Sequence, residues 1–258
     1  MERYGVVHDY RGPRMRFGAA WFAVILIAMW LGSFAVTLLF TFAAALAALQ
    51  AATRWAGRQA EVSPAVATAM PLLCGLAAFG NLRLVGLALI IGVVASLLLG
   101  PDGRPLPLPT GPESIQERLP MAAATLRCAL APIAVAVSVV QVHRTDSFAF
   151  LFLAAIVSVY DAGDYLIGAG YDQRAAGPVA GIIAAFAMTA AMSIIEPPPL
   201  QGNQVWLVGV TLGLLAPLGQ LAASWVLPSA RASAPALRRL DTWLLSAPVF
   251  MVLLWIIA

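Results

Sequence analysis

The chain has 258 residues, of which 61% are hydrophobic and only 10% are charged, and its formal net charge is +3. A soluble domain of this length usually carries about 25% charged residues, so the composition excludes an ordinary water-soluble fold. It predicts an all-α, polytopic integral membrane protein. The sequence has no basic run with interleaved aromatic residues, so nucleic-acid binding is not expected.

Nine apolar segments approach the roughly 20 residues that a membrane-spanning helix needs. They predict about nine transmembrane helices, at residues 17–31, 33–52, 64–80, 84–100, 121–141, 147–169, 176–195, 204–227 and 240–258. The first segment is short, and if it forms one bent or re-entrant unit with the second, the count is eight. Residues 1–16 are expected to form a cytoplasmic N-terminal tail, and residues 17–258 form one transmembrane domain.

Two connecting segments are rich in residues that break helices. Residues 101–120 contain six prolines, and this density predicts that the whole segment is a loop. Residues 196–204 contain three consecutive prolines and form a second stiff loop.

The basic residues are distributed unevenly over these segments. All 15 are arginine, which indicates a GC-rich coding sequence and favours a bacterial source. With a cytoplasmic N-terminus and nine alternating helices, twelve arginines face the cytoplasm, two face the opposite side and one lies within the fifth helix. The asymmetry predicts a multi-pass protein of the bacterial inner membrane. The twelve are Arg3, Arg11, Arg14, Arg16, Arg54, Arg58, Arg104, Arg118, Arg174, Arg231, Arg238 and Arg239; the two are Arg83 and Arg144, and the intramembrane residue is Arg127.

The densest group of ionisable residues within a predicted spanning helix is the run Tyr160-Asp161-Ala162-Gly163-Asp164-Tyr165. Asp161 and Asp164 are three residues apart and share a helical face. Two carboxylates on one face can hold a hard cation such as Mg²⁺, which can in turn bind a nucleoside triphosphate. The alternative is that both aspartates pair with Arg174 or Arg127 and only cap a helix end.

A second charged group, Arg231, Arg238, Arg239 and Asp241, lies on the same predicted side of the membrane. By spacing alone it is a positive-inside anchor, but its arginines can also bind a phosphate through two parallel hydrogen bonds. Tryptophans near the segment ends are expected to anchor the helices at the membrane interface; they are Trp21, Trp55, Trp206 and Trp243.

At these residues the sequence resembles the phosphatidate cytidylyltransferases, also called CDP-diacylglycerol synthases. The run FLFLAAIVSVYDAGDYLIGAG (150–170) is similar to the family's central motif, Ser/Ala-Asp-Thr-Gly-Ala-Tyr-x-x-Gly, with matches at Asp161, Gly163, Tyr165 and Gly168. The segment LRRLDTWLLSAPVFMVLL (237–254) resembles the family's C-terminal ending, with matches that include Asp241, Ala247 and Pro248.

The chain also departs from the family pattern. The family has Gly-Asp-Leu where this chain has Gly219-Gln220-Leu221, and Asp164 stands where the family has alanine. Ser224 is kept, but the basic pair that follows in the family is replaced by Leu227-Pro228, and the family's His-Gly-Gly is missing. Arg238 replaces the first aspartate of Asp-Arg-x-Asp, while Arg239 and Asp241 remain.

The resemblance implies a membrane enzyme of phospholipid biosynthesis that transfers CMP from CTP to a phosphatidate-like lipid and releases pyrophosphate. It implies that Asp161 and Asp241 are catalytic and that, with Asp164 as an auxiliary ligand, they hold Mg²⁺. Substrate would be bound by Tyr165, Arg174, Arg238 and Arg239. The oligomeric state, including a homodimer, is left open.

Two other functions are also compatible with the sequence. The missing His-Gly-Gly and Gly-Asp elements favour a catalytically degenerate relative that acts as a membrane scaffold or partner-binding subunit. In an ion-coupled transporter, Asp161 and Asp164 would bind the ion, but the chain shows no sign of inverted repeats.

Overall fold

The computed structural model describes residues 14–58, 61–108, 111–168, 175–229 and 232–257, with the side chains described from Gly18 onward. These residues form ten helices and contain no β-strand beyond an isolated bridge between Leu99 and Pro105. The helices are α1 (Arg14–Leu31), α2 (Ser33–Ala56), α3 (Pro64–Gly80), α4 (Leu82–Leu98), α5 (Pro112–Thr145), α6 (Ser147–Gly168), α7 (Ala176–Ile195), α8 (Asn203–Val226), α9 (Pro235–Leu240) and α10 (Trp243–Ile257).

The all-helical class is confirmed for the described residues. Six candidate spans are long and apolar enough to cross a membrane, namely α2, α5, α6, α7, α8 and the combined segment Pro235–Ile257. The apolar part of α1 (from Gly18), α3 and α4 are shorter, and α3 and α4 have 17 residues each, at the lower limit of about 17–25. The six long helices support a membrane protein, whereas the count of nine spans stays a prediction.

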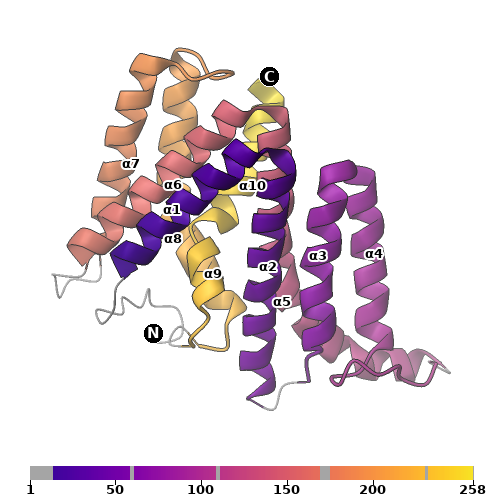
Figure 1. Ribbon diagram of the computed structural model, residues 1–258. Coiled ribbons are helices and arrows are strands. Elements are labelled where there is room, and N and C mark those ends of the chain that lie inside the picture. The colour runs from indigo at the N-terminus through magenta and orange to yellow at the C-terminus, as the bar shows by residue number, and fades with distance from the viewer. Residues whose placement is uncertain (1–13, 59–60, 109–110, 169–174, 230–231, 258) are drawn as a thin grey trace.

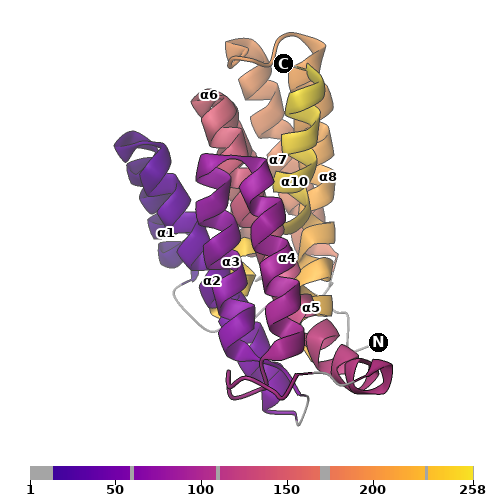
Figure 2. The same ribbon diagram turned by 90° about the vertical axis from the view of Figure 1, so that its right-hand side faces the viewer.

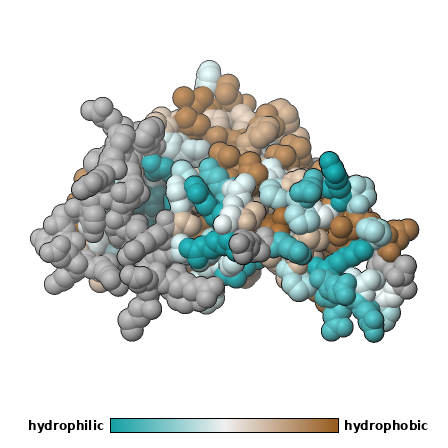
Figure 3. All heavy atoms as spheres, turned by 90° about the horizontal axis from the view of Figure 1, so that it is seen from below, coloured by the Kyte–Doolittle hydropathy of each residue, from teal (hydrophilic) through white to brown (hydrophobic). Residues whose placement is uncertain are grey.

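Successive long helices run in alternating directions, so their ends gather at two ends of the bundle (Figure 1). We call the end where α9 lies the α9 end; α2 and α8 finish there and α3 and α5 begin there. Arg54, Arg118 and Arg239 lie on helix segments at this end, whereas Arg83 and Arg144 lie at the opposite end. Viewed from the α9 end, hydrophilic side chains cross the centre of the described surface (Figure 3).

The prediction that residues 101–120 form a loop is wrong for its second part, because α5 already begins at Pro112. Proline is tolerated in the first turn of a helix, where its missing N–H has no intrahelical partner in any case. Pro120 lies inside the helix and removes one backbone donor, which favours a bend. The first turns of α5 lie across the α9 end rather than along the bundle axis (Figures 1 and 2).

The segment predicted at 240–258 corresponds to α10, which begins three residues later, and a short helix that the sequence did not predict, α9, precedes it. α9 ends at Leu240, Asp241 and Thr242 form a turn, and α10 begins at Trp243. Irregular backbone inside a membrane protein is tolerated where protein rather than lipid surrounds it. Thr242 is fully buried, and Asp241 is only 8% exposed, so this break is enclosed by protein.

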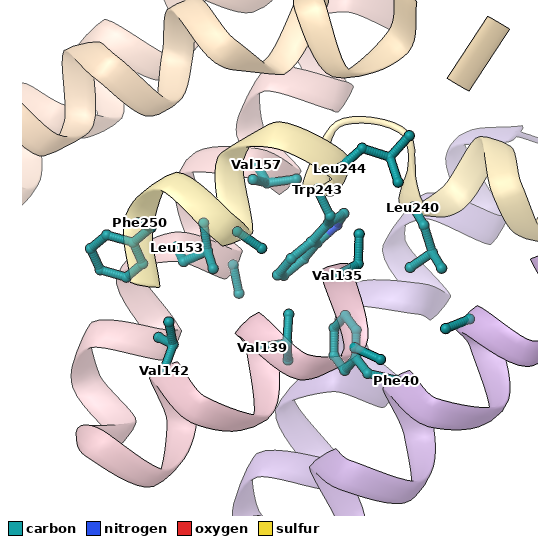
Figure 4. Packing of buried hydrophobic residues seen from close by; sticks show 14 of the residues in the cluster. Phe40, Val135, Val139, Val142, Leu153, Val157, Leu240, Trp243, Leu244 and Phe250 are labelled. Carbon is teal, nitrogen blue, oxygen red and sulfur yellow. The ribbon is translucent and has the colours of Figure 1, made fainter. Parts of the chain in front are cut away.

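The prediction that Trp243 anchors the protein at the membrane interface is also wrong. Its side chain is 1% exposed and lies in the main hydrophobic core, between α2, α5, α6 and α10 (Figure 4). Its ring centroid is 5.1 Å from that of Phe40 and 6.4 Å from that of Phe150. The residue after the break therefore fixes α10 against the core, and with it the position of Asp241.

Candidate functional site

Three aspartates from two distant parts of the chain lie near one another, and we call Asp161, Asp164 and Asp241 the acidic cluster. α6 contributes Asp161 and Asp164, and the break between α9 and α10 contributes Asp241. Asp164 is 7% and Asp241 8% exposed, and Asp161 is half-buried. The charges of Asp164 and Asp241 both act on Asp161, so the three carboxylates share one electrostatic environment. Such a grouping is costly without compensating positive charge.

Thr242 connects the two halves of the cluster. Its hydroxyl donates a hydrogen bond to Oδ2 of Asp161 over 3.4 Å, and its backbone N–H donates to Oδ1 of Asp241 over 2.8 Å. One residue at the helix break therefore orients a carboxylate on α6 and a carboxylate on its own turn. The sequence alone does not single out Thr242, because its role depends on a contact with a distant helix.

Asp164 accepts a hydrogen bond from a position at which the family has a different residue type. Nε2 of Gln220 on α8 donates to Oδ2 of Asp164 over 2.9 Å, and both side chains are buried. Gln220 stands where the family has aspartate, and Asp164 stands where the family has alanine. The structure thus brings the lost carboxylate position and the added carboxylate into direct contact.

Two buried oxygen atoms beside the cluster have no hydrogen-bond partner within the described residues: Oη of Tyr160 and Oε1 of Gln220. Tyr160 lies within electrostatic range of all three aspartates. Buried polar atoms are nearly always paired, so unpaired ones suggest an absent ion or water. Carboxylate and amide oxygens are the donors that Mg²⁺ prefers, so the donor set fits this cation in its chemistry. As they stand, no three His, Cys, Asp or Glu side chains of the described residues are arranged to hold a metal ion.

Two of the predicted phosphate-binding arginines lie beside the acidic cluster. Nη1 of Arg238 donates to Oγ of Ser224 over 3.3 Å, and the charge of Arg238 acts on Asp241. The charge of Arg239 acts on both Asp161 and Asp241. These guanidinium groups supply the positive charge that buried carboxylates require.

Of the other two predicted substrate-binding residues, the structure describes Tyr165 but not Arg174. Tyr165 is half-buried on α6, directly after Asp164. Arg174 lies outside the described residues, as does Arg231, so the structure does not place them. The sequence also suggested that Arg127 pairs with Asp161 and Asp164. In the structure, Arg127 instead donates through Nε to the backbone O of Trp225 over 2.9 Å.

Basic and aromatic side chains at the C-terminal end of α2, in the turn after it and on α5 fix the segment that leads into α9. Each donates a hydrogen bond to a backbone carbonyl in the last turn of α8 or in the segment between α8 and α9. The pairs are Arg54 with Ser233, Trp55 with Val226, Arg58 with Pro228 and Arg127 with Trp225. Several arginines that the sequence assigned to membrane orientation thus also hold α9, and with it Arg238 and Arg239, in place.

Two glycines allow the helices of the site to approach closely. A Cβ added at Gly163 would lie 2.9 Å from the backbone O of Ala180, so α6 and α7 meet there almost backbone to backbone. A Cβ added at Gly219 would lie 2.3 Å from the backbone O of Asp241. Small residues are the usual means of close helix packing in membranes. Gly219 therefore lets α8 reach the break that carries Asp241.

We expect Gly219→Ala to lower the free energy of unfolding by about 1–3 kcal/mol, because the new methyl group overlaps the Asp241 carbonyl and must push the break away. Thermal unfolding in detergent measures the effect. Gly86→Ala on α4 is the matched control, since a Cβ at Gly86 meets nothing within 4 Å, and it should be neutral or slightly stabilising. Equal melting temperatures for both variants would contradict the close approach.

These features define a helical membrane protein with buried carboxylates and guanidinium groups at a helix break. The model of the cytidylyltransferase family matches residues 13–227, which is most of the chain. The chain therefore belongs to the cytidylyltransferase family, that of the phosphatidate cytidylyltransferases. No curated protein and no solved structure matches it. The matched range includes the central motif of α6 and ends before Arg238, Arg239 and Asp241.

Proposed function

We propose that this protein is a membrane enzyme that transfers CMP from CTP to a phosphatidate-like lipid and releases pyrophosphate. Membership of the family implies CTP as substrate and nucleotidyl transfer as the reaction class. The apolar helices support a substrate that also resides in the membrane. The observation that carries the proposal is the meeting of Asp161 with Thr242 and Asp241, because it brings the family's central and C-terminal motifs to one site.

In this reaction an oxygen of the lipid phosphate attacks the α-phosphorus of CTP. The new P–O bond forms as the bond from the α-phosphorus to the oxygen bridging to the β-phosphorus breaks, and that electron pair leaves with pyrophosphate. Arg238 and Arg239 would bind the phosphates of the two substrates and oppose their mutual repulsion. Thr242 would hold Asp161 and Asp241 in a fixed relation while the substrates bind.

Asp161 and Asp241, with Asp164 as an auxiliary ligand, would hold Mg²⁺ in this proposal. A magnesium ion bound there supplies positive charge against the triphosphate. The carboxylates would have to rearrange to complete its ligand set, because no three His, Cys, Asp or Glu side chains among the described residues are positioned for a metal ion. The hydrogen bonds from Thr242 to Asp161 and from Gln220 to Asp164 restrain these two carboxylates.

The placement in the membrane follows from the arginines. We infer that the α9 end faces the cytoplasm of a bacterial cell, where CTP is available, because the arginines that the structure describes are concentrated there. The acidic cluster would then be reached by CTP from the cytoplasm and by lipid from the cytoplasmic leaflet.

The direct test is to incubate the purified protein with labelled CTP, phosphatidate and MgCl₂ and to measure CDP-lipid and pyrophosphate. We expect both products in equal amounts and none when phosphatidate is omitted. An authentic phosphatidate cytidylyltransferase assayed in parallel is the control. If the control forms product and this protein forms none over a range of Mg²⁺ concentrations, the enzymatic proposal fails.

A catalytically degenerate relative that acts as a scaffold is the second candidate. It is favoured by the amide at Gln220, where the family has a carboxylate, and by the incomplete metal-ligand arrangement among the described residues. In that case the protein should retain its fold without consuming CTP, and substitutions in the acidic cluster should change only its stability.

A further inference from the structure

An apolar groove of about 610 Å³ lies beside α2, between α1 and α9. Its walls include Trp21 of α1, Leu39 and Ala43 of α2 and Pro235 of α9. Leu46, which also lines it, is 48% exposed, so the groove is open at the side of the bundle. Its volume lies within the roughly 300–1,000 Å³ range of small-molecule sites in proteins.

The groove has polar side chains in an otherwise apolar wall. Gln50 and Arg239 both line it, and Oε1 of Gln50 accepts a hydrogen bond from the backbone N–H of Ala236 over 2.9 Å. Gln50 thereby ties α9 to α2. Arg239 belongs to both places, because it lines the groove and its charge acts on Asp161 and Asp241.

This combination selects for one kind of occupant. Within a bilayer, lipid chains are already surrounded by hydrocarbon, so an apolar wall alone contributes shape and little affinity. Preference for one lipid must then come from its charged end. A guanidinium binds a phosphate monoester through parallel charged hydrogen bonds. A diacylglycerol has no phosphate, and the phosphate of phosphatidylcholine is a diester beside a positive charge, so both should bind the guanidinium less tightly.

We propose that the groove between α1, α2 and α9 binds an acyl chain of the phosphatidate-type lipid substrate, with Arg239 contacting its phosphate at the entrance to the acidic cluster. The inference rests on the proposed function for the identity of the lipid. It goes further by assigning the lipid to one side of the bundle, the face that α1 and α2 share. The lipid phosphate would then approach Asp161 from the α9 side.

The inference is tested by photolabelling the full-length protein in nanodiscs with a phosphatidate that carries a diazirine in one acyl chain. Mass spectrometry should locate the label on α2 between Leu39 and Leu46. Excess phosphatidate should displace it, whereas diacylglycerol and phosphatidylcholine should not. Ala43→Trp, which fills the groove, should abolish this label, and Leu46→Trp serves as a second variant at a more exposed position. Ala187→Trp, at an exposed alanine of α7, is the matched control and should label normally.

Kinetics provide an independent measurement. Ala43→Trp should raise KM for phosphatidate by about tenfold or more and leave KM for CTP unchanged. Label on α2 without any CDP-lipid product would overturn the proposed reaction and support the assignment of the groove as a lipid-binding site. If the protein forms product, Ala43→Trp leaves KM for phosphatidate unchanged and the label lies elsewhere, the groove is not the lipid-binding site and the proposed reaction stands. Equal displacement by all three lipids, or crosslinks from α2 to a second copy of the chain, would also overturn it.

Discussion

Replacing Asp161 by asparagine is expected to lower kcat/KM for CDP-lipid formation by about 100-fold or more while the protein stays folded. Asparagine keeps the shape of the side chain and can still accept the hydrogen bond from Thr242. It removes the negative charge and replaces one acceptor oxygen by an NH₂ group, and in the proposed reaction the charged oxygens are needed to hold Mg²⁺ beside the triphosphate. Rates measured over a range of CTP and Mg²⁺ concentrations, together with melting temperatures, separate lost chemistry from lost stability.

Asp146→Asn is the matched control for this substitution. Asp146 precedes α6 at the opposite end of the bundle, and its Oδ1 accepts a hydrogen bond from the backbone N–H of Ala149 over 2.8 Å. Asparagine caps a helix about as well as aspartate, so both activity and stability should stay close to those of the unchanged protein. Wild-type activity in Asp161→Asn would remove Asp161 from the site, and an equal loss in both variants would show a general effect of charge.

Moving a carboxylate from position 164 on α6 to position 220 on α8 should restore the activity that Asp164→Ala alone removes. Asp164→Ala alone is expected to lower kcat/KM by about 10–100-fold, because it removes a ligand and leaves the Gln220 amide without its acceptor. Asp164→Ala combined with Gln220→Asp returns a carboxylate to the cluster from the other helix and restores the family pattern at both positions. The double variant should recover activity to within about tenfold of the unchanged protein, a strongly non-additive result.

The comparison requires a control in which the carboxylate is added elsewhere on α8. Gln204 lies in the first turn of α8, where Oε1 accepts a hydrogen bond from the backbone N–H of Gln201, far along the helix from Gln220. Asp164→Ala with Gln204→Asp has the same net charge as the rescuing pair and should remain as slow as Asp164→Ala. If the two double variants are equally active, position 220 has no special role.

Much of the local structure could be predicted from the sequence, because an apolar run flanked by glycine, proline or charge is a local signal. The bounds expected for the segments at 64–80 and 176–195 coincide with α3 and α7. The start of α5 could not be predicted from the proline density of 101–120, because that density does not distinguish a loop proline from one in the first turn of a helix. Pro112 lies in the first turn of α5, where proline is favourable, and Pro120 is accommodated inside the helix at the loss of one backbone donor.

The candidate site could be predicted only as separate parts. Residue type and the family pattern predict Asp161, Asp164 and Asp241 as site residues, and the structure places them together. Their partners could not be predicted in the same way. Thr242 meets Asp161 across 81 positions of the chain, and Gln220 meets Asp164 across 56. No spacing rule reaches that far, since such contacts depend on how whole helices pack.

By itself, the sequence determined the class of the protein and the positions of most of its helices. Composition requires an apolar solvent, and backbone hydrogen bonding in that solvent requires helices. Only the tertiary structure decided that a short helix and a turn at Asp241 precede α10, that Trp243 is a core residue rather than an interface anchor, and that Arg239 lines a groove while its charge acts on the acidic cluster. Each of these depends on close packing, as where Gly219 meets the Asp241 carbonyl, and packing is decided by neighbours that are distant in the sequence.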